Sequence, residues 1–215
     1  WRLFPSFANK IFTSFDLSIT SNLETKDYLE KLGGKNIFNF GNLKFSINLD
    51  NQKIKNCNEN SLLERSFWCA ASTHYPEEEF CLKTHIKLKR NIENILTIIV
   101  PRHINRSKEI LEICKKYKLN TQILNSEEKI LNSSEIVIIN SFGKLPIFFK
   151  YAKSVFIGKS MVKKLEKNSG QNPILAAKLG CKVYHGPYYS NFFEVYEYLK
   201  KNNISQEIKD ENELS

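Results

Sequence analysis

Residues 66–103 of the chain read SFWCAASTHYPEEEFCLKTHIKLKRNIENILTIIVPRH. Two short apolar runs, at 67–71 and 96–100, enclose a longer segment that begins at Pro76, a residue favoured in the first turn of a helix. Short apolar runs that alternate with helices are typical of a parallel sheet, because crossover helices bury such strands on both faces. This stretch therefore predicts an α/β fold.

The same alternation continues toward the end of the chain. It predicts strands at 120–124, 135–140, 154–158 and 182–185, and helices that begin near Asn105, Ser126, Lys144, Asn172 and Asn191. Six strand-then-helix units in roughly 135 residues are typical of one doubly wound domain. The charged tail after Lys201 is expected to fray.

A different pattern precedes this domain. Residues 17–20 and 36–40 are expected to be strands, and the helix between them is expected to stop at Gly33, where glycine suits a left-handed cap. Residues 46–60 are polar, rich in Asn and Lys, and without a regular period, which predicts a linker.

The composition is that of an ordinary globular protein. The chain has 215 residues, of which 41% are hydrophobic and 26% charged. Its net charge of +9 favours an anionic partner such as phosphate, nucleic acid or acidic lipid. No run approaches the ~18 apolar residues of a membrane span. Because it opens at Trp1 without Met or a signal-type segment, the chain is expected to be part of a longer polypeptide.

The sequence lacks the motifs that are typical of several kinds of catalytic and binding site. The five cysteines include no C-x-x-C pair and the four histidines no H-E-x-x-H spacing, so the sequence favours a reduced setting and no metal site. The chain also lacks G-x-G-x-x-G, G-x-x-x-x-G-K-[ST] and G-x-S-x-G, and therefore gives no support to a dinucleotide fingerprint, a P-loop or a hydrolase elbow.

Polar side chains follow the predicted strands, where open parallel sheets bind ligands. Ser72, Thr73 and His74 follow the first strand of the domain, and Arg102 and His103 follow the second. Hydroxyl, imidazole and guanidinium groups bind phosphate or carboxylate. A capped helix start and a solvated surface pair explain the same residues without a ligand, so both interpretations stay open.

The segment from Ser169 to Pro173 is the sharpest local signal. Asn172 is a strong N-cap candidate, Pro173 suits the first helical position, and Gly180 suits the cap at the other end. The start of such a helix offers free N–H groups to an anion, although every capped helix does so. Beside the turn at 158–160, the segment indicates a bound phosphate.

Taken together, these motifs resemble those of the bacterial Kdo transferases, glycosyltransferases that add 3-deoxy-D-manno-octulosonic acid (Kdo) to a lipid A precursor. The resemblance runs nearly from end to end of the chain. Its motifs are GNLKF at 41–45, AASTH at 70–74 with Glu77 and Glu78, PRH at 101–103, the stretch 151–160, GQNP at 170–173, and HGP at 185–187 with Asn191 and Phe192.

The resemblance implies a GT-B glycosyltransferase architecture of two Rossmann-like domains. Residues 1–45 would be the end of the N-terminal acceptor domain, 46–60 the linker, 61–200 the C-terminal domain that binds the nucleotide sugar, and 201–215 a tail. The implied reaction is the inverting transfer of Kdo from CMP-Kdo to lipid IVA in lipopolysaccharide biosynthesis.

The resemblance also implies which residues bind the donor. Arg102, the helix at Asn172 and Lys44 would stabilise the CMP phosphate as it leaves. The whole expected set is Lys44, Ser72, Thr73, His74, Arg102, His103, Ser160, Gly170, Gln171 and Asn172. The general base is expected in an N-terminal domain outside this chain, so no catalytic residue is assigned here and the chain alone is expected to be inactive.

No cofactor and no metal are implied. The implied partners are CMP-Kdo, the lipid A precursor and, by peripheral contact, the cytoplasmic face of the bacterial inner membrane, with no nucleic acid. Two other functions stay open: a related GT-B enzyme that uses another nucleotide sugar, and a non-catalytic binder of polyanions. If the chain is a polyanion binder, its affinity should depend steeply on salt concentration. If it is the enzyme, it should bind CMP saturably, and Arg102→Ala should weaken that binding.

Three positions depart from the pattern of the family. The acid expected to hold the ribose hydroxyls is replaced by Leu175, which accepts no hydrogen bond from them. Lys144 replaces the glutamate of a Gly-Glu-Leu motif, and Lys159 replaces the second glycine of a Gly-Gly-Ser motif. These departures bear on nucleotide affinity and on donor identity.

Overall fold

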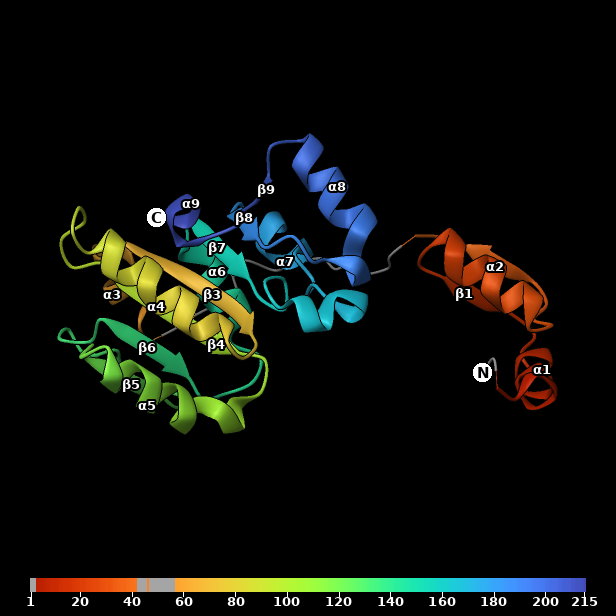
Figure 1. The fold of residues 1–215 in the computed structure, drawn as a ribbon, viewed down its shortest axis with the longest axis horizontal. Helices are drawn as coiled ribbons and strands as arrows, with labels where there is room; N and C mark the ends of the chain where they lie inside the picture. Colours follow the sequence, from red (N-terminus) through yellow and green to blue (C-terminus); the bar gives the residue numbers. More distant parts are fainter. Residues whose placement is uncertain (1–2, 42–45, 47–56) are drawn as a thin grey trace. The chain divides into compact units, whose positions relative to one another are not determined.

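The computed structural model of the protein describes residues 3–41, 46 and 57–215. The chain divides into two compact units, Trp1–Leu49 and Asp50–Ser215 (Figure 1). Lys44, one of the expected site residues, lies outside the described residues. No helix in the described part of the chain is long and apolar enough to cross a membrane.

The smaller unit contains a pair of parallel strands. Its elements are α1 (Pro5–Thr13), β1 (Ser18–Thr20), α2 (Leu23–Lys31) and β2 (Ile37–Asn39). Asn22 caps α2, since its Oδ1 accepts a hydrogen bond from the Thr25 N–H at 2.8 Å, and Gly33 follows the helix with φ +87°. The predicted strands and the helix between them are confirmed, whereas α1 is an element that was not predicted.

The larger unit is built on a seven-stranded sheet in which every neighbouring pair is parallel. The strand order is β5-β6-β4-β3-β7-β8-β9. The strands are β3 (Phe67–Thr73), β4 (Leu96–Pro101), β5 (Thr121–Leu124), β6 (Ile136–Ile139), β7 (Ser154–Ile157), β8 (Lys182–His185) and β9 (Ser205–Glu207). The predicted parallel sheet is therefore confirmed, with six of its strands at the expected places.

Helices cover both faces of this sheet. They are α3 (Glu59–Glu64), α4 (Glu77–Leu88), α5 (Ser107–Lys116), α6 (Leu145–Tyr151), α7 (Ile174–Lys178), α8 (Phe193–Lys201) and α9 (Glu211–Leu214), with 3-10 turns at Ile104–Arg106, Lys163–Asn168 and Ser190–Phe192. Strand β3 alternates between two cores: Cys69 belongs to the core that includes residues of α6 and α7, while Trp68 belongs to the core that includes residues of α4 and α5. This alternation explains why the strand reads as a continuous apolar run.

The helix expected near Ser126 is absent from the structure. Asn58 reaches this segment instead: its Nδ2 donates to the Glu128 carbonyl at 2.9 Å, and its Oδ1 accepts from the Ile130 N–H at 2.7 Å. These bonds satisfy the backbone in an irregular loop. Asn58 is buried and α3 begins at Glu59, so the last residues of the expected linker pack on the larger unit.

The expectation of a frayed tail is wrong. Strand β9 extends the sheet beside β8, and Ile208 is fully buried between them and the next helix. Asp210 then caps α9, since its Oδ1 accepts hydrogen bonds from the N–H groups of Asn212 and Glu213. The charged composition of the segment hid the two buried positions, Ser205 and Ile208, that anchor it.

His85 on α4 makes the stability of the larger unit depend on pH. The imidazole is fully buried, its Nδ1 lies 2.9 Å from Thr97 Oγ1, and burial lowers the pKa of His85 to about 4. Because the unfolded chain binds the proton more tightly, the contribution of His85 is present above pH 6.5 and is lost as the pH falls toward 4.

We expect His85 to account for a loss of about 2 kcal/mol in the free energy of unfolding between pH 7 and pH 5. Urea unfolding of the wild type and of His85→Gln at the two pH values measures this contribution. The variant should show a shallower pH dependence. Parallel curves for the two proteins would contradict the assignment.

Candidate binding site at the centre of the sheet

The carboxyl ends of β3, β4 and β7 meet at the centre of the sheet. Strand β3 lies between the other two, and the chain leaves it toward β4 on one side and returns as β7 on the other. The Arg102 N–H donates to the Thr73 carbonyl at 3.1 Å, and the Gly158 N–H donates to the Ala71 carbonyl at 2.8 Å. Such a reversal of strand order is where open α/β sheets bind ligands.

A buried carboxylate, Glu77, holds the loops after β3 and β7 together. Its Oε2 accepts hydrogen bonds from the N–H groups of His74 at 2.9 Å and Lys159 at 2.7 Å, and its Oε1 accepts those of Ser160 at 2.8 Å and Met161 at 3.0 Å. Burial raises the pKa of Glu77, whereas the four N–H donors favour the ionised form. The backbone donors after β7 are therefore satisfied by the protein's own anion.

The backbone around Glu77 has an unusual conformation that brings these donors together. Ser72 and Lys159 have left-handed φ values of +57° and +58°, and such residues let successive N–H groups converge on one anion. Gly158 lies against the opposite loop, because a Cβ there would be 2.6 Å from the Ser72 carbonyl oxygen and 2.7 Å from Thr73 Cα. The two loops are thus in direct contact.

Ser160 does not line the cleft, contrary to expectation. Its side chain is fully buried, and its hydroxyl donates to the Ile157 carbonyl at 2.7 Å and accepts from the Gly186 N–H at 2.9 Å. Both hydrogen bonds are made within the fold. Ser160 therefore ties the end of β7 to the turn after β8 and offers no surface to a ligand.

His74 and His103, by contrast, are brought together as expected. Their rings lie 5.8 Å apart in an edge-to-face arrangement, and Nδ1 of His74 lies 3.1 Å from the Ser72 carbonyl oxygen. A carbonyl only accepts, so Nδ1 carries the proton and Nε2 is free to accept. Burial lowers the pKa of His74, and the charges of Lys159 and His103 lower it further. His74 is thus suited to a hydroxyl of a ligand.

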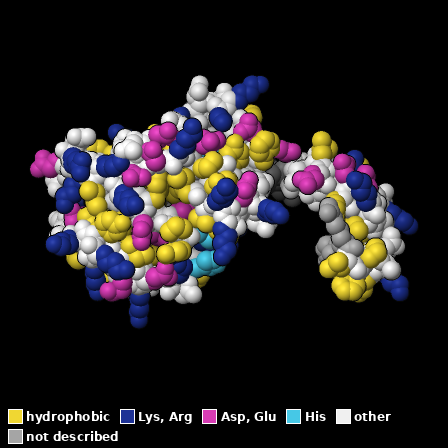
Figure 2. All heavy atoms as spheres, in the orientation of Figure 1, with side chains coloured by type: hydrophobic (Ala, Val, Ile, Leu, Met, Phe, Trp, Pro, Cys, Tyr) yellow, Lys and Arg dark blue, Asp and Glu magenta, His cyan; other side chains and the backbone are white. Residues whose placement is uncertain are grey.

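Two exposed residues, one of them a cation, lie at the same strand ends. Arg102 and His103 are exposed, and within the described residues no ion-pair partner is found for Arg102 or Lys159. Figure 2 shows histidine side chains at the surface of the larger unit with Lys and Arg beside them. Thr73, like Ser160, is fully buried and offers no surface to a ligand in this structure, although its Oγ1 has no hydrogen-bond partner in the part of the chain that the structure describes. The arrangement suits an anionic ligand.

Another basic residue near the site, Arg106, forms ion pairs with acidic side chains of the protein. Its guanidinium binds Glu78 through both terminal nitrogens, at 2.7 and 3.2 Å, and also Glu109. Glu78 is fully buried. Glu77 and Glu78 belong to the motif that begins at Ala70, but the sequence predicts neither of their anchoring roles. Their adjacency at a strand end was the available signal.

The segment from Gly170 to Asn172 lies beside this site, but most of its polar groups make hydrogen bonds within the fold. The Gly170 N–H donates to the Lys159 carbonyl at 2.6 Å, and the Gln171 carbonyl accepts from the Tyr196 hydroxyl at 2.9 Å. Asn172 Oδ1 accepts the Ile174 N–H at 3.0 Å, and α7 is only five residues long. The anion site expected at this helix start is thus partly filled by the protein itself.

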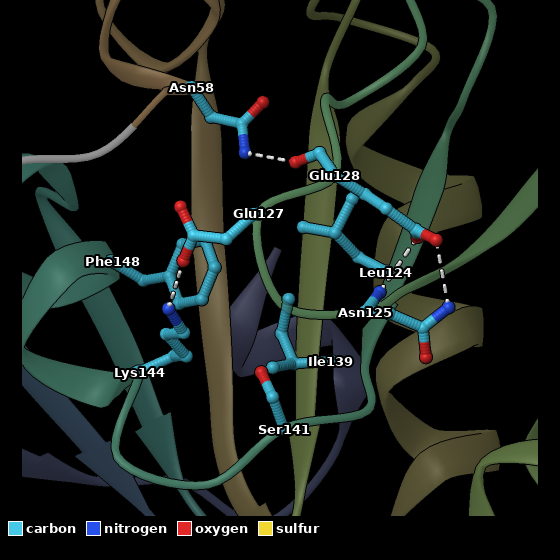
Figure 3. Close-up of a pocket in the computed structure, with 9 residues that line it drawn as sticks. All are labelled: Asn58, Leu124, Asn125, Glu127, Glu128, Ile139, Ser141, Lys144 and Phe148. Atoms are coloured by element: carbon cyan, nitrogen blue, oxygen red, sulfur yellow. Dashed lines mark hydrogen bonds and ion pairs between the residues drawn. The ribbon is translucent and has the colours of Figure 1, made fainter.

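A cavity lies at the ends of β5 and β6. Figure 3 shows Lys144 paired with Glu127 at 3.1 Å and Asn125 bonded to Glu128, below Asn58. The cavity has a volume of about 20 Å³, room for about one water molecule. It is too small for a nucleotide. In the described residues, no group of three His, Cys, Asp or Glu side chains is arranged to hold a metal ion.

The seven-stranded, all-parallel sheet is an α/β fold of the GT-B type. The chain is similar to solved and curated Kdo transferases. Its structure matches the C-terminal CMP-Kdo binding domain of WaaA from Acinetobacter baumannii with a TM-score of 0.64 and 26% identity, covering 72% of this chain and 78% of that one. The predicted GT-B fold and the resemblance to Kdo transferases are both confirmed.

Curated relatives give the same result. The 3-deoxy-D-manno-octulosonic acid transferase of Aquifex aeolicus is 28% identical over 210 residues, 97% of this chain and 55% of the relative. That of Rickettsia felis is 29% identical over 220 residues, 100% and 46%, and that of Haemophilus influenzae is 28% identical over 162 residues, 74% and 37%. No family model matches. The chain spans 37% to 55% of the length of these relatives, which are glycosyltransferases.

Proposed function

We propose that the chain is the donor-binding part of a Kdo transferase, which transfers Kdo from CMP-Kdo to a lipid A precursor, lipid IVA, with inversion. The observation that carries the proposal is the match of this sheet to a CMP-Kdo binding domain, with the exposed Arg102 and the His74–His103 ring pair at the ends of its central strands. Such groups suit a nucleotide monophosphate with a sugar attached.

In this proposal, the residues of the site stabilise the charge of the leaving phosphate. As the bond from Kdo to CMP breaks, negative charge grows on the phosphate, and a cation held at that point lowers the barrier. Arg102 is the proposed cation, and the free Nε2 of His74 is proposed to accept a hydrogen bond from a ligand hydroxyl. We place the general base in another part of a longer protein and expect the 215-residue chain alone to be inactive, with no cofactor or metal.

The proposed acceptor is an anionic lipid, which places the enzyme at the cytoplasmic face of the inner membrane by peripheral contact. The net charge of +9 supports this, because basic surfaces are attracted to anionic membranes. Nucleic acid is not a partner in the proposal. A GT-B enzyme with another donor is the second candidate, and it is favoured by Leu175, which offers no acceptor to ribose.

Calorimetric titration with CMP, cytidine, UMP and GMP tests the proposal on the chain as it stands. We expect saturable binding of CMP, weaker binding of cytidine, and little binding of the other two. Preference for UMP or GMP would favour the second candidate. Binding only to polyanions such as heparin, with a steep salt dependence, would contradict both enzymes.

A further inference from the structure

Lys159 occupies a backbone position that favours glycine. Its φ is +58°, in the left-handed region that residues with a Cβ rarely adopt. The conformation is fixed from both sides, because the Lys159 N–H donates to Glu77 at 2.7 Å and its carbonyl accepts from the Gly170 N–H at 2.6 Å. Nothing in the backbone arrangement calls for a lysine.

The side chain has no evident role within the fold. It is half-buried, and among the residues that the structure describes it makes no hydrogen bond or ion pair. Its charge nevertheless acts on the site, since it contributes to the lowered pKa of His74. A cation that acts on the His74 imidazole and has no ion-pair partner among the described residues is available to an anionic ligand.

The sheet places Lys159 and Arg102 on opposite sides of one strand end. Lys159 follows β7 and Arg102 follows β4, and β3 lies between them. Neighbouring strands are roughly 4.8 Å apart, so the two residues start about 10 Å from each other, within reach of one anion over the end of β3. Because its backbone is held by two hydrogen bonds, the Lys159 side chain starts from a fixed position at the site.

We propose that Lys159 is a second cation of the donor site and that it binds the phosphate of the nucleotide from the side opposite Arg102. The inference rests on the proposed function and adds to it a residue that determines affinity for the phosphate. It predicts that Lys159 contributes to the binding of CMP and not to that of cytidine, which lacks the phosphate.

The variant Lys159→Gly separates ligand binding from structure. We expect its affinity for CMP to fall about 10-fold and its affinity for cytidine to stay the same. The melting temperature should stay the same or rise, because glycine adopts the left-handed conformation without strain. Lys159→Met should lose the same CMP affinity without a rise in melting temperature. Lys163→Ala, which removes an exposed lysine of the next turn, is the matched control and should bind CMP like the wild type.

Titration calorimetry on the 215-residue chain and its variants gives distinguishable outcomes. Equal CMP affinity in the wild type and in Lys159→Gly would overturn the role of Lys159 and leave the proposed function standing. A wild type that binds CMP no better than cytidine would overturn the proposed function, and the inference with it.

Discussion

Replacing Glu77 with alanine is expected to lower the free energy of unfolding by about 4 kcal/mol. The substitution removes the shared acceptor of four backbone N–H groups, those of His74, Lys159, Ser160 and Met161. Buried donors left without partners are costly, and the loss of one side of a buried charged network commonly amounts to about 3–5 kcal/mol. Urea unfolding followed by circular dichroism at pH 7 measures the change.

Glu79→Ala is the matched control for this experiment. Glu79 lies on the same helix turn, is only half-buried, and makes no side-chain hydrogen bond within the described residues. Its replacement should change the free energy of unfolding by less than about 0.5 kcal/mol. If Glu77→Ala were as mild as the control, water would be replacing the carboxylate, and Glu77 would not be what holds the two loops together.

Replacing Arg102 with alanine is expected to weaken CMP binding by about 10- to 100-fold. A charge-assisted hydrogen bond to phosphate contributes about 1.5–3 kcal/mol, and the guanidinium of Arg102 has no ion-pair partner among the described residues to keep it from the ligand. Cytidine affinity should change little, since the nucleoside carries no phosphate. Isothermal titration of both ligands at one fixed salt concentration measures the difference.

Arg90→Ala provides the corresponding control. Arg90 is exposed just beyond the end of α4, a helix that starts at the site and runs back toward the opposite edge of the sheet. Removing it lowers the net charge by the same amount without touching the site. Equal losses of CMP affinity in the two variants would show that binding follows overall charge, as a polyanion binder requires, and would contradict a localised phosphate site.

The fold was largely predictable because its strands are buried on both faces. Continuous apolar runs such as 67–71 and Ile136–Ile139 stand out in the sequence. Strand β9 was missed because Ser205–Glu207 is short and polar, and only its pairing with β8 makes it a strand. The helix expected at Ser126 is absent because of another contact that the local sequence does not show. Asn58, far away in the sequence, binds the backbone of that segment.

The sequence indicated which residues gather at the ends of the central strands, but not which of them are bound within the fold. Placing polar residues after β3 and β4 correctly brought His74 beside His103, because parallel strands end at one edge. The sequence did not show which backbone N–H groups of the site are already bound by the protein's own side chains. Ser160 follows a strand as a ligand-binding residue would, but the acid that takes its N–H, Glu77, is distant in the sequence and approaches only in the folded sheet.

A crystal structure of the chain bound to CMP is the most direct test of the account. The account predicts that the phosphate lies over the carboxyl end of β3, within hydrogen-bond distance of the Arg102 guanidinium, with Glu77 still bound to the loop after β7. A nucleotide bound at another edge of the sheet, or one whose phosphate leaves Arg102 in solvent, would contradict it.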